Sequence, residues 1–286
     1  MKPAIVIVGF NRPKSLERLL SSIRNGQYCH DDIDMVISID YQNSEARREV
    51  LDIANKFSWN HGNKLVINHN ENLGLRKHVL TCGDLTSQYQ SIIMLEDDLV
   101  VSPYFYTYAQ TMLSFYNNSP EIGGISLYNH KRNFCNKLPF EVLGERNSDV
   151  YFLQIASSWG QAWTAKQWKE FKEWYNKGQQ LDVEDLIPSE VISWPNSSWL
   201  KFFIKYLVVT NKYFVYPKNS LSTNFGDGGT HNLKSNSSYQ VPLDLSDDPD
   251  LKLIPLNRSI NVYDAFFEIL PATLKKLNLQ LIDRAF

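Results

Sequence analysis

The sequence predicts an α/β protein in which a mostly parallel sheet is covered by helices on both faces. Two observations predict this class. Short apolar, β-branched runs alternate with segments of helical periodicity over residues 1–127, which is typical of repeated strand–helix units. A chain of 286 residues can also bury the core of one large α/β domain or of two smaller ones.

The first strand–helix unit lies at the N-terminus. Residues 4–10 form an apolar run that suits a buried parallel strand. Pro13 suits the first turn of a helix, and Asn25-Gly26 can end that helix. Between these two points, apolar side chains recur at i, i+3, i+4 and i+7, namely Leu16, Leu19, Leu20 and Ile23.

The same alternation continues as far as residue 127. Further strands are predicted over residues 33–39, 64–68, 91–95 and 122–127. Further helices are predicted over residues 44–57 and 73–85, and from Pro103, where Ser102 can act as the cap. One face of this last helix carries Phe105, Tyr108, Ala109, Met112 and Tyr116.

The second half of the chain has a different character. Residues 128–200 hold six of the seven tryptophans and show few clear strands. Such an aromatic-rich half suits a flat ligand such as a sugar ring, or it packs a core. Helices are predicted over residues 164–177 and 199–210, with a short strand at 213–216. Residues 224–238 form a Gly/Asn/Ser-rich loop, and 241–258 are rich in Pro and Asp.

Composition excludes several classes of protein. The 29 Lys and Arg residues and 31 Asp and Glu residues give a formal charge of −2, so we expect no nucleic-acid partner. Cys29, Cys82 and Cys135 form no CxxC pair, which argues against a disulfide framework or a zinc site. No apolar run is long enough for a secretory signal or a membrane span. We therefore expect a cytoplasmic protein.

Three adjacent carboxylates, Glu96, Asp97 and Asp98, end the predicted strand at 91–95. Strand ends of an open α/β sheet meet in the crevice where ligands bind. Carboxylates this close repel one another unless solvent, a shared proton or a cation intervenes. Their hard oxygens favour Mg²⁺ or Mn²⁺, which usually bind substrate phosphates as well. The cluster therefore predicts a site for a nucleoside diphosphate, unless it is an acidic turn in solvent.

Other side chains could complete such a site. Asp40 also ends a predicted strand and could accept hydrogen bonds from a base or ribose. Arg12 follows the first strand, and Arg76 starts the third helix, so both could meet phosphate charge. The glycine-rich loops of P-loop and dinucleotide-binding proteins are absent from the sequence. Neutralisation of phosphate charge must then come from a metal ion and side chains.

At this point the sequence resembles nucleotide-sugar glycosyltransferases of the GT-A fold, close to family 2 enzymes and N-acetylglucosaminyltransferase I. The resemblance rests on four segments near the N-terminus and two later ones. These segments are Ile5-Val-Ile-Val-Gly-Phe-Asn-Arg-Pro13, Ile37-Ser-Ile-Asp40, Asn72-Leu-Gly-Leu-Arg76, Met94-Leu-Glu-Asp-Asp-Leu-Val-Val-Ser-Pro103, Trp159-Gly-Gln-Ala-Trp163 and Phe225-Gly-Asp-Gly-Gly-Thr-His231.

The resemblance implies a role for each matching position. Asp98 would be the direct ligand of Mn²⁺ or Mg²⁺, and His231 would assist the metal or the diphosphate. The remaining positions would bind the donor: Phe10, Asn11 and Arg12 at the base, Asp40 and Arg76 at the nucleoside, Glu96 and Asp97 near the ribose and the metal's waters, and Trp159, Gly160 and Trp163 behind the sugar. The loop at 225–231 would close over the diphosphate.

The catalytic base is the point where the sequence departs from this pattern. Related enzymes carry an aspartate next to a tryptophan just before the helix that corresponds to residues 199–210. Here residues 193–199 contain no carboxylate. Glu190 and Asp185 are the nearest upstream candidates, so both the base and the stereochemical outcome stay open.

The resemblance implies a single GT-A domain. Residues 1–127 would form the nucleotide-sugar donor subdomain, 128–240 the acceptor-binding and loop subdomain, and 241–286 a C-terminal extension. The implied enzyme is a metal-dependent hexosyltransferase that would invert the configuration at the anomeric carbon. Its donor would be a UDP-sugar and its acceptor a saccharide or lipid-linked glycan, as in surface polysaccharide assembly.

Two other functions stay open. A sugar nucleotidylyltransferase also uses carboxylate-bound Mg²⁺, although Gly9-Phe-Asn-Arg-Pro13 lacks the glycine-rich loop of those enzymes. A receiver-like or lectin-like module would bind an ion or a sugar without catalysis. Residues 262–286 mix apolar and basic side chains and are divided by Pro271. This segment could touch a membrane peripherally, or pack on its own domain or a partner.

Overall fold

The structure is a computed structural model that describes residues 1–28, 32–181, 186–228, 237–246, 250–275 and 277. Its strands are β1 (Ala4–Gly9), β2 (Met35–Ile39), β3 (Lys64–Asn68), β4 (Ser91–Glu96), β5 (Leu99–Val101), β6 (Ile122–Ser126), β7 (Val150–Leu153), β8 (Gln161–Thr164), β9 (Tyr213–Pro217), β10 (Ser222–Asn224) and β11 (Val262–Tyr263). Its helices are α1 (Pro13–Arg24), α2 (Glu45–Lys56), α3 (Gly74–Gly83), α4 (Thr86–Tyr89), α5 (Phe105–Phe115), α6 (Ala165–Tyr175), α7 (Ser189–Ile192) and α8 (Leu200–Val209), with 3₁₀ turns η1 (Ser237–Tyr239) and η2 (Leu256–Arg258).

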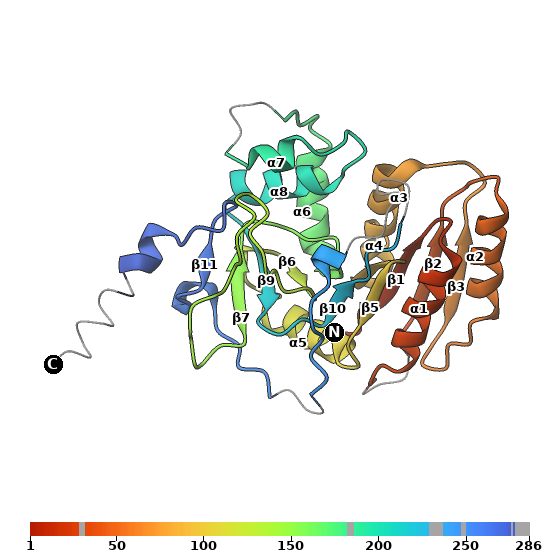
Figure 1. Ribbon diagram of the computed structural model, residues 1–286, viewed down its shortest axis with the longest axis horizontal. Coiled ribbons are helices and arrows are strands. Elements are labelled where there is room, and N and C mark those ends of the chain that lie inside the picture. Colours follow the sequence, from red (N-terminus) through yellow and green to blue (C-terminus); the bar gives the residue numbers. More distant parts are fainter. Residues whose placement is uncertain (29–31, 182–185, 229–236, 247–249, 276, 278–286) are drawn as a thin grey trace.

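Within the described residues, one sheet of nine strands runs through the molecule in the order β11-β7-β9-β6-β8-β4-β1-β2-β3 (Figure 1). Strands β4, β1, β2 and β3 pair in parallel. Strand β8 is antiparallel to both β4 and β6, and β7 is antiparallel to β9. The predicted α/β class with a mostly parallel sheet is therefore confirmed.

Side chains of β1 show how the sheet separates two cores. Ile5 and Ile7 point into one apolar cluster, and Val6 and Val8 point into the other, as strand alternation requires. The first cluster includes apolar side chains of α1, α2 and α5, and the second includes those of α3, α6 and α8. Because both faces are covered, β1 is apolar along its whole length.

The second half of the chain adds more strands than its sequence indicates. Strand β8 lies within the Trp159–Trp163 motif, and β7 follows a long irregular segment. Both are only four residues long, and β8 begins with a buried Gln161 and ends with a buried Thr164. Strands this short show no clear alternation of apolar and polar residues, so the periodicity criterion misses them.

A close approach joins α3 to α6. A Cβ atom on Gly83 would lie 2.0 Å from the Trp168 ring, so only glycine lets α3 pack this closely. The Trp168 indole N–H donates to Asp84 Oδ1 at 2.8 Å, and Lys172 pairs with the same carboxylate at 3.0 Å. The two helices are thus held together next to the sheet.

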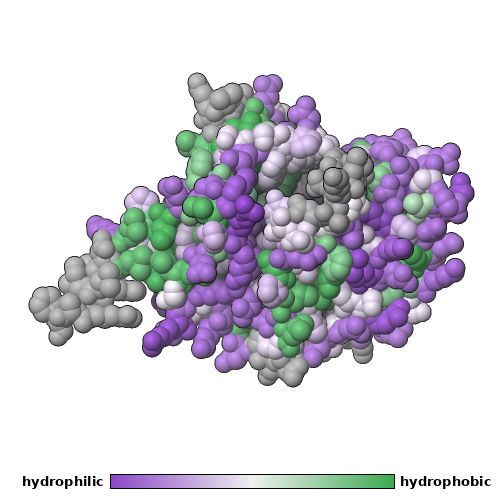
Figure 2. Space-filling model, viewed as in Figure 1, coloured by the Kyte–Doolittle hydropathy of each residue, from purple (hydrophilic) through white to green (hydrophobic). Residues whose placement is uncertain are grey.

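The C-terminal part of the chain joins the sheet edge. Strand β11 pairs in parallel with β7, and apolar surface gathers beside it in Figure 2. Exposed apolar side chains of this part include Phe266 and Leu274. In the described part of the chain, no helix has both the length and the apolar character needed to span a bilayer.

Candidate active site

A cleft of about 410 Å³ lies at the carboxyl ends of β1, β2 and β4. The chain leaves these strands at Phe10, Asp40 and Asp97, and all three residues line the cleft. Parallel strands that start at different points in the sequence therefore bring their following residues to one place. A two-stranded ladder of β5 and β10 places Asn224 beside the same cleft.

One end of the cleft, here called the acidic end, consists of Glu96, Asp97, Asp98 and Arg12. The Arg12 guanidinium donates to Asp98 Oδ2 at 2.9 Å and also pairs with Asp97 Oδ1. The backbone N–H of Phe10 donates to Asp97 Oδ2 at 3.4 Å. The family resemblance implies that Arg12 lies at the base, whereas in the structure its side chain turns toward the two aspartates.

Burial and mutual repulsion alter the protonation of the acidic end. Burial first, and the charge of Asp98 second, raises the pKa of Glu96 to about 8. Burial also raises the pKa of Asp97 to about 6, although Arg12 opposes that shift. Burial would lower the pKa of Arg12, but the charges of Asp97 and Asp98 outweigh it and raise that pKa. The acidic end therefore contains one arginine that stays protonated and three carboxyl groups, so Arg12 alone cannot neutralise all of them.

The acidic end suits a divalent cation. Asp98 Oδ1 is buried and has no hydrogen-bond partner, so one hard oxygen is left for an additional positive charge. Among the described residues, no three His, Cys, Asp or Glu side chains are grouped so that they could hold an ion by themselves. A cation here would thus be bound by one or two carboxylates and by ligand phosphates, as is usual for Mg²⁺.

Asp40 has a structural partner within the cleft wall. Its carboxylate accepts the backbone N–H groups of Leu73 at 2.8 Å and Gly74 at 3.0 Å, at the start of α3. An anionic group is stabilised at this helix end. Asp40 lines the cleft, so a ligand would meet a carboxylate already fixed by two amides.

A polar triangle lies behind Asp40. Ser38 Oγ lies 2.8 Å from His78 Nε2 and 3.0 Å from His69 Nε2. Burial lowers the pKa of His78 to about 4, so its ring is neutral near pH 7. Since His78 lines the cleft, it presents a neutral imidazole to a ligand.

A second part of the cleft wall, here called the aromatic end, consists of Trp159 and Tyr239 together with Tyr128 and His130, which pack against Trp159. The ring centroids of Trp159 and Tyr239 are 4.7 Å apart at an interplanar angle of 36°, and both residues line the cleft. Tyr128 packs edge-on against Trp159 at 4.7 Å, and its hydroxyl donates to the Tyr239 carbonyl. An aromatic wall of this kind can pack against the flat face of a sugar ring.

Residues 225–227, here called the latched loop, are held against α1. Asp227 accepts a hydrogen bond from Ser15 Oγ at 2.6 Å and pairs with Arg18. The Arg18 guanidinium lies 3.8 Å from the centroid of the Phe225 ring. The Phe225 N–H donates to the Asp98 carbonyl at 2.9 Å, which ties the loop to the acidic end. Gly226 and Asp227 consequently line the cleft.

The cleft brings together most of the predicted donor-binding residues. Those that line it are Phe10, Asn11, Arg12, Asp40, Glu96, Asp97, Asp98 and Trp159. Gly160 lies next to them and has a φ of +90°, which favours glycine at the turn before β8.

Other predicted residues lie elsewhere. Trp163 is fully buried in the core around α6 and α8, so the structure does not bring its ring to the cleft. Arg76 lines a neighbouring cavity. Glu190 is half-buried on α7 and does not line the cleft. Asp185 and His231 lie outside the described residues.

Several residues of the cleft were not singled out in the sequence. They are Asn72, His78, Ser197, Asn224 and Tyr239. His78 could have been found one helical turn after Gly74, facing the sheet. Tyr239 carries no such signal, because its place depends on a ring contact with Trp159, which is distant in the sequence.

Comparison with known proteins agrees with this geometry. The model of the glycosyl transferase family 2 matches residues 4–167. Among curated proteins, none matches the sequence.

Two solved structures can be compared with the chain. A mannosyltransferase from Pyrobaculum calidifontis, PcManGT, solved with GDP-Man and Mn²⁺, is similar with a TM-score of 0.52 and 14% identity over 81% of this chain and 59% of that one. Residues 1–349 of TarS from S. aureus, solved with UDP-GlcNAc, give a TM-score of 0.49 and 13% identity over 83% of this chain and 62% of that one. The chain thus spans about three fifths of the length of either protein.

Proposed function

The chain belongs to the glycosyl transferase family 2, and we propose that it transfers a hexose from a nucleoside diphosphate sugar to a saccharide or lipid-linked glycan hydroxyl. The proposed donor is a UDP-sugar, and the proposed cofactor is Mn²⁺ or Mg²⁺. The GT-A resemblance noted in the sequence agrees with the family and with the fold of the mannosyltransferase.

One observation supports this proposal above the others. Asp98 lies in the cleft next to Asp97 and Glu96, and its Oδ1 is buried without a partner. A carboxylate left in this state costs about 1–3 kcal/mol, and a cation bound together with a diphosphate would remove that cost. Asp98 would hold the ion, with Asp97 and Glu96 beside it.

The proposed reaction is a single displacement. The acceptor oxygen forms a bond to the anomeric carbon while the bond from that carbon to the diphosphate oxygen breaks, so the configuration inverts. The proton of the acceptor hydroxyl passes to a carboxylate base. Glu190 and Asp185 are the candidates for this base, because they are the carboxylates nearest upstream of residues 193–199 in the sequence. A divalent cation would supply charge neutralisation at the departing diphosphate, worth several kcal/mol.

Residues of this chain would bind the donor in three parts. Asp40, Asn11 and Phe10 lie where the nucleoside would bind, at the ends of β1 and β2. Arg12 and the latched loop with Asp227 would face the diphosphate. Trp159 and Tyr239 would contact the sugar. We also propose a donor subdomain (1–127), an acceptor-binding and loop subdomain (128–240) that lends Trp159, Asp227 and Tyr239 to the donor cleft, and an extension (241–286).

The proposed setting is the cytoplasmic side of surface polysaccharide assembly, with peripheral contact to a membrane that carries the acceptor. Exposed Phe266 and Leu274 support such a contact. Co-sedimentation with anionic liposomes tests it: recovery of the wild type in the pellet and of Phe266→Ser in the supernatant is expected. Recovery of both in the supernatant would contradict it.

A donor panel tests the function itself. UDP-, GDP- and dTDP-sugars are added with and without Mn²⁺, and thermal stability and release of nucleoside diphosphate are measured. We expect one donor to raise Tm only with Mn²⁺, since binding to the native state stabilises it. Release of pyrophosphate from a nucleoside triphosphate would indicate a nucleotidylyltransferase instead. Sugar binding without any nucleotide binding would indicate a lectin-like module.

A further inference from the structure

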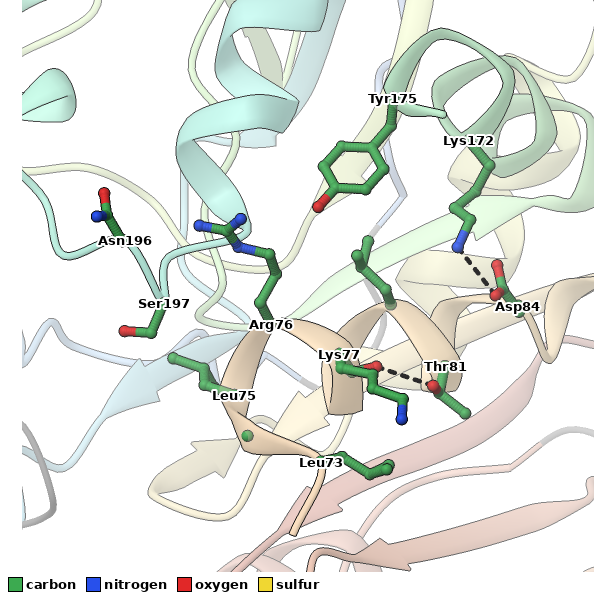
Figure 3. Close-up of a pocket in the computed structure, with 12 residues that line it drawn as sticks. Leu73, Leu75, Arg76, Lys77, Thr81, Asp84, Lys172, Tyr175, Asn196 and Ser197 are labelled. Carbon is green, nitrogen blue, oxygen red and sulfur yellow. Dashed lines mark hydrogen bonds and ion pairs between the residues drawn. The ribbon is translucent and has the colours of Figure 1, made fainter. Parts of the chain in front are cut away.

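A second cavity, of about 490 Å³, lies beside the donor cleft. Its walls come from α3, from α6 and from the segment that precedes α8 (Figure 3). Gly74, Leu75 and Ser197 line both this cavity and the donor cleft. A molecule that lies in the second cavity can therefore extend into the cleft where the donor is proposed to bind.

The cations around this cavity differ in how well they are neutralised. Lys172 pairs with Asp84 at 3.0 Å, and exposed Lys77 pairs with Glu71 at 3.6 Å. Arg76 has neither a hydrogen bond nor an ion pair to any described residue, and its Nε is buried without a partner. Its guanidinium instead stacks on the ring of Phe202, at 4.7 Å from the ring centroid.

The surroundings of Arg76 are positive. The Lys201 ammonium is held by the Trp194 carbonyl at 3.0 Å, and burial first, then the charge of Arg76, lowers the pKa of Lys201. In Figure 3 the Tyr175 hydroxyl points into the same space as the Arg76 guanidinium, and Ser197 lies on the other side of it. A guanidinium fork with hydroxyl groups beside it is suited to a carboxylate or a phosphate.

The position of the second cavity limits which molecule it could bind. The donor's diphosphate is proposed to bind at the acidic end, where Arg12 and the carboxylates lie, and that end does not line the second cavity. The second cavity meets the donor cleft at Gly74, Leu75 and Ser197, and none of these three belongs to the acidic end. A ligand that passes Ser197 is thus an acceptor rather than a second part of the donor.

We propose that the second cavity binds an anionic group of the acceptor, a carboxylate or a phosphate, through Arg76. This inference rests on the proposed function, because it presumes a donor in the adjoining cleft. The acceptor would then be an acidic saccharide or a sugar phosphate rather than a neutral glycan. Arg76 would position the acceptor and take no part in bond breaking.

Binding of small probes tests this inference. Glucuronic acid, glycerol phosphate and glucose are titrated by NMR into the protein in the presence of saturating UDP and Mn²⁺, at constant ionic strength. At least one anionic probe should bind ten or more times as tightly as glucose. Whether glucuronic acid or glycerol phosphate binds more tightly identifies the anion as a carboxylate or a phosphate.

Substitutions locate the anion. Arg76→Gln should weaken the anionic probe at least tenfold while the Kd of UDP changes less than threefold, and Tyr175→Phe should weaken the probe severalfold. Arg48→Gln removes an exposed, paired arginine on α2 and is the matched control, for which no change is expected. Tyr175→Phe also serves as the test if Arg76→Gln fails to fold.

Different failures have different meanings. Equal binding of the anionic probes and glucose, or an anionic Kd that is unchanged in both variants, would overturn the inference. A loss of UDP affinity in Arg76→Gln as large as the loss for the anion would overturn it too and would assign Arg76 to the nucleotide. The protein could also bind no nucleotide and still bind the anion through Arg76. That result would contradict the proposed function, while the assignment of an anion site at Arg76 would stand.

Discussion

The acidic end and the aromatic end of the cleft are built from opposite kinds of side chain. At the acidic end, Arg12 is shared between Asp97 and Asp98, and one carboxylate oxygen has no partner. At the aromatic end, Trp159 is surrounded by rings that contact one another. The acidic end needs a bound cation to neutralise its carboxylates, whereas the rings of the aromatic end already pack against one another without a ligand. We therefore expect substitutions at the first end to change catalysis and those at the second to change stability and affinity.

The largest effect should come from Asp98→Asn. If the carboxylate holds a cation, the loss of several kcal/mol of charge stabilisation lowers the rate of transfer by about 10³-fold or more. Tm should stay close to that of the wild type, because the amide keeps the shape of the side chain. Donor turnover and a thermal melt measure the two effects. Asp52→Asn, at an exposed position on α2, is the control, and wild-type turnover by Asp98→Asn would exclude the metal role.

Acid should lower the free energy of unfolding through a buried histidine of the aromatic end. Burial lowers the pKa of His130 to about 3, so between pH 6.5 and about 3 the unfolded chain binds the proton that the folded chain refuses. Stability is therefore complete above pH 6.5 and falls on acidification, by about 2 kcal/mol at pH 5 from this residue. Urea unfolding at pH 7.5 and pH 5 measures it. His130→Phe should show a smaller difference between the two pH values, and an equal difference would assign the acid sensitivity to other groups.

The two tryptophans of one motif should separate affinity from stability. Trp159→Ala removes a ring from the cleft wall and should raise the KM for the donor about fivefold, since an aromatic contact of this kind is worth about 1 kcal/mol. Trp163→Phe should leave KM unchanged and lower Tm, because that ring is buried in the core. Steady-state kinetics and thermal melts of both variants test this. A large KM change in Trp163→Phe would show that the motif acts on the donor as one unit.

Substitutions in the latched loop should change donor binding less than the substitutions above. Asp227→Asn weakens the contact with Arg18, both partners of which are partly exposed, so its loss costs no more than about 1 kcal/mol. We expect a rise in donor KM of severalfold with little change in kcat, measured by donor titration. Ser15→Ala removes a single hydrogen bond to the same carboxylate and should change KM less. A fall in kcat without a change in KM would point to Asp227 as a group that acts on the reacting atoms.

The smallest effect is expected from Glu190→Gln. The side chain is half-buried on α7 and does not line the cleft, so turnover should change less than twofold in a donor-release assay. Asp185→Asn is the companion variant. A fall of a hundredfold or more in either variant would identify the acceptor base.

The sequence was most informative where strands were apolar on both sides. Strands β1 to β4 could be predicted because their runs are β-branched and separated by helical periods. The residues that follow β1, β2 and β4 could be expected to meet, because parallel strands end at one edge. Strands β7 and β8 could not be predicted, since four residues are too few to show a period and β8 also carries buried Gln161 and Thr164.

Side-chain direction within the site could not be predicted either. Nothing local shows that Arg12 turns to Asp97 and Asp98, or that Trp163 turns into the core while Trp159 faces the cleft. Those directions depend on contacts between residues far apart in the sequence, such as Arg12 with Asp98 and Trp163 with Phe203. The contact of Tyr239 with Trp159 is of the same kind.

The absent side chain of Gly83 has a consequence beyond its own helix. Because the backbone of α3 lies against Trp168 there, the distance between α3 and α6 is fixed next to Asp84, which lines the second cavity, while Gly83 itself does not. Arg76 and Tyr175 lie on these same two helices, so an alanine at position 83 would push the helices apart and widen the mouth between those two residues. A change of one methyl group could thus alter which molecules fit there while every contacting residue stays the same, and natural variation at such a position would tune selectivity from a distance.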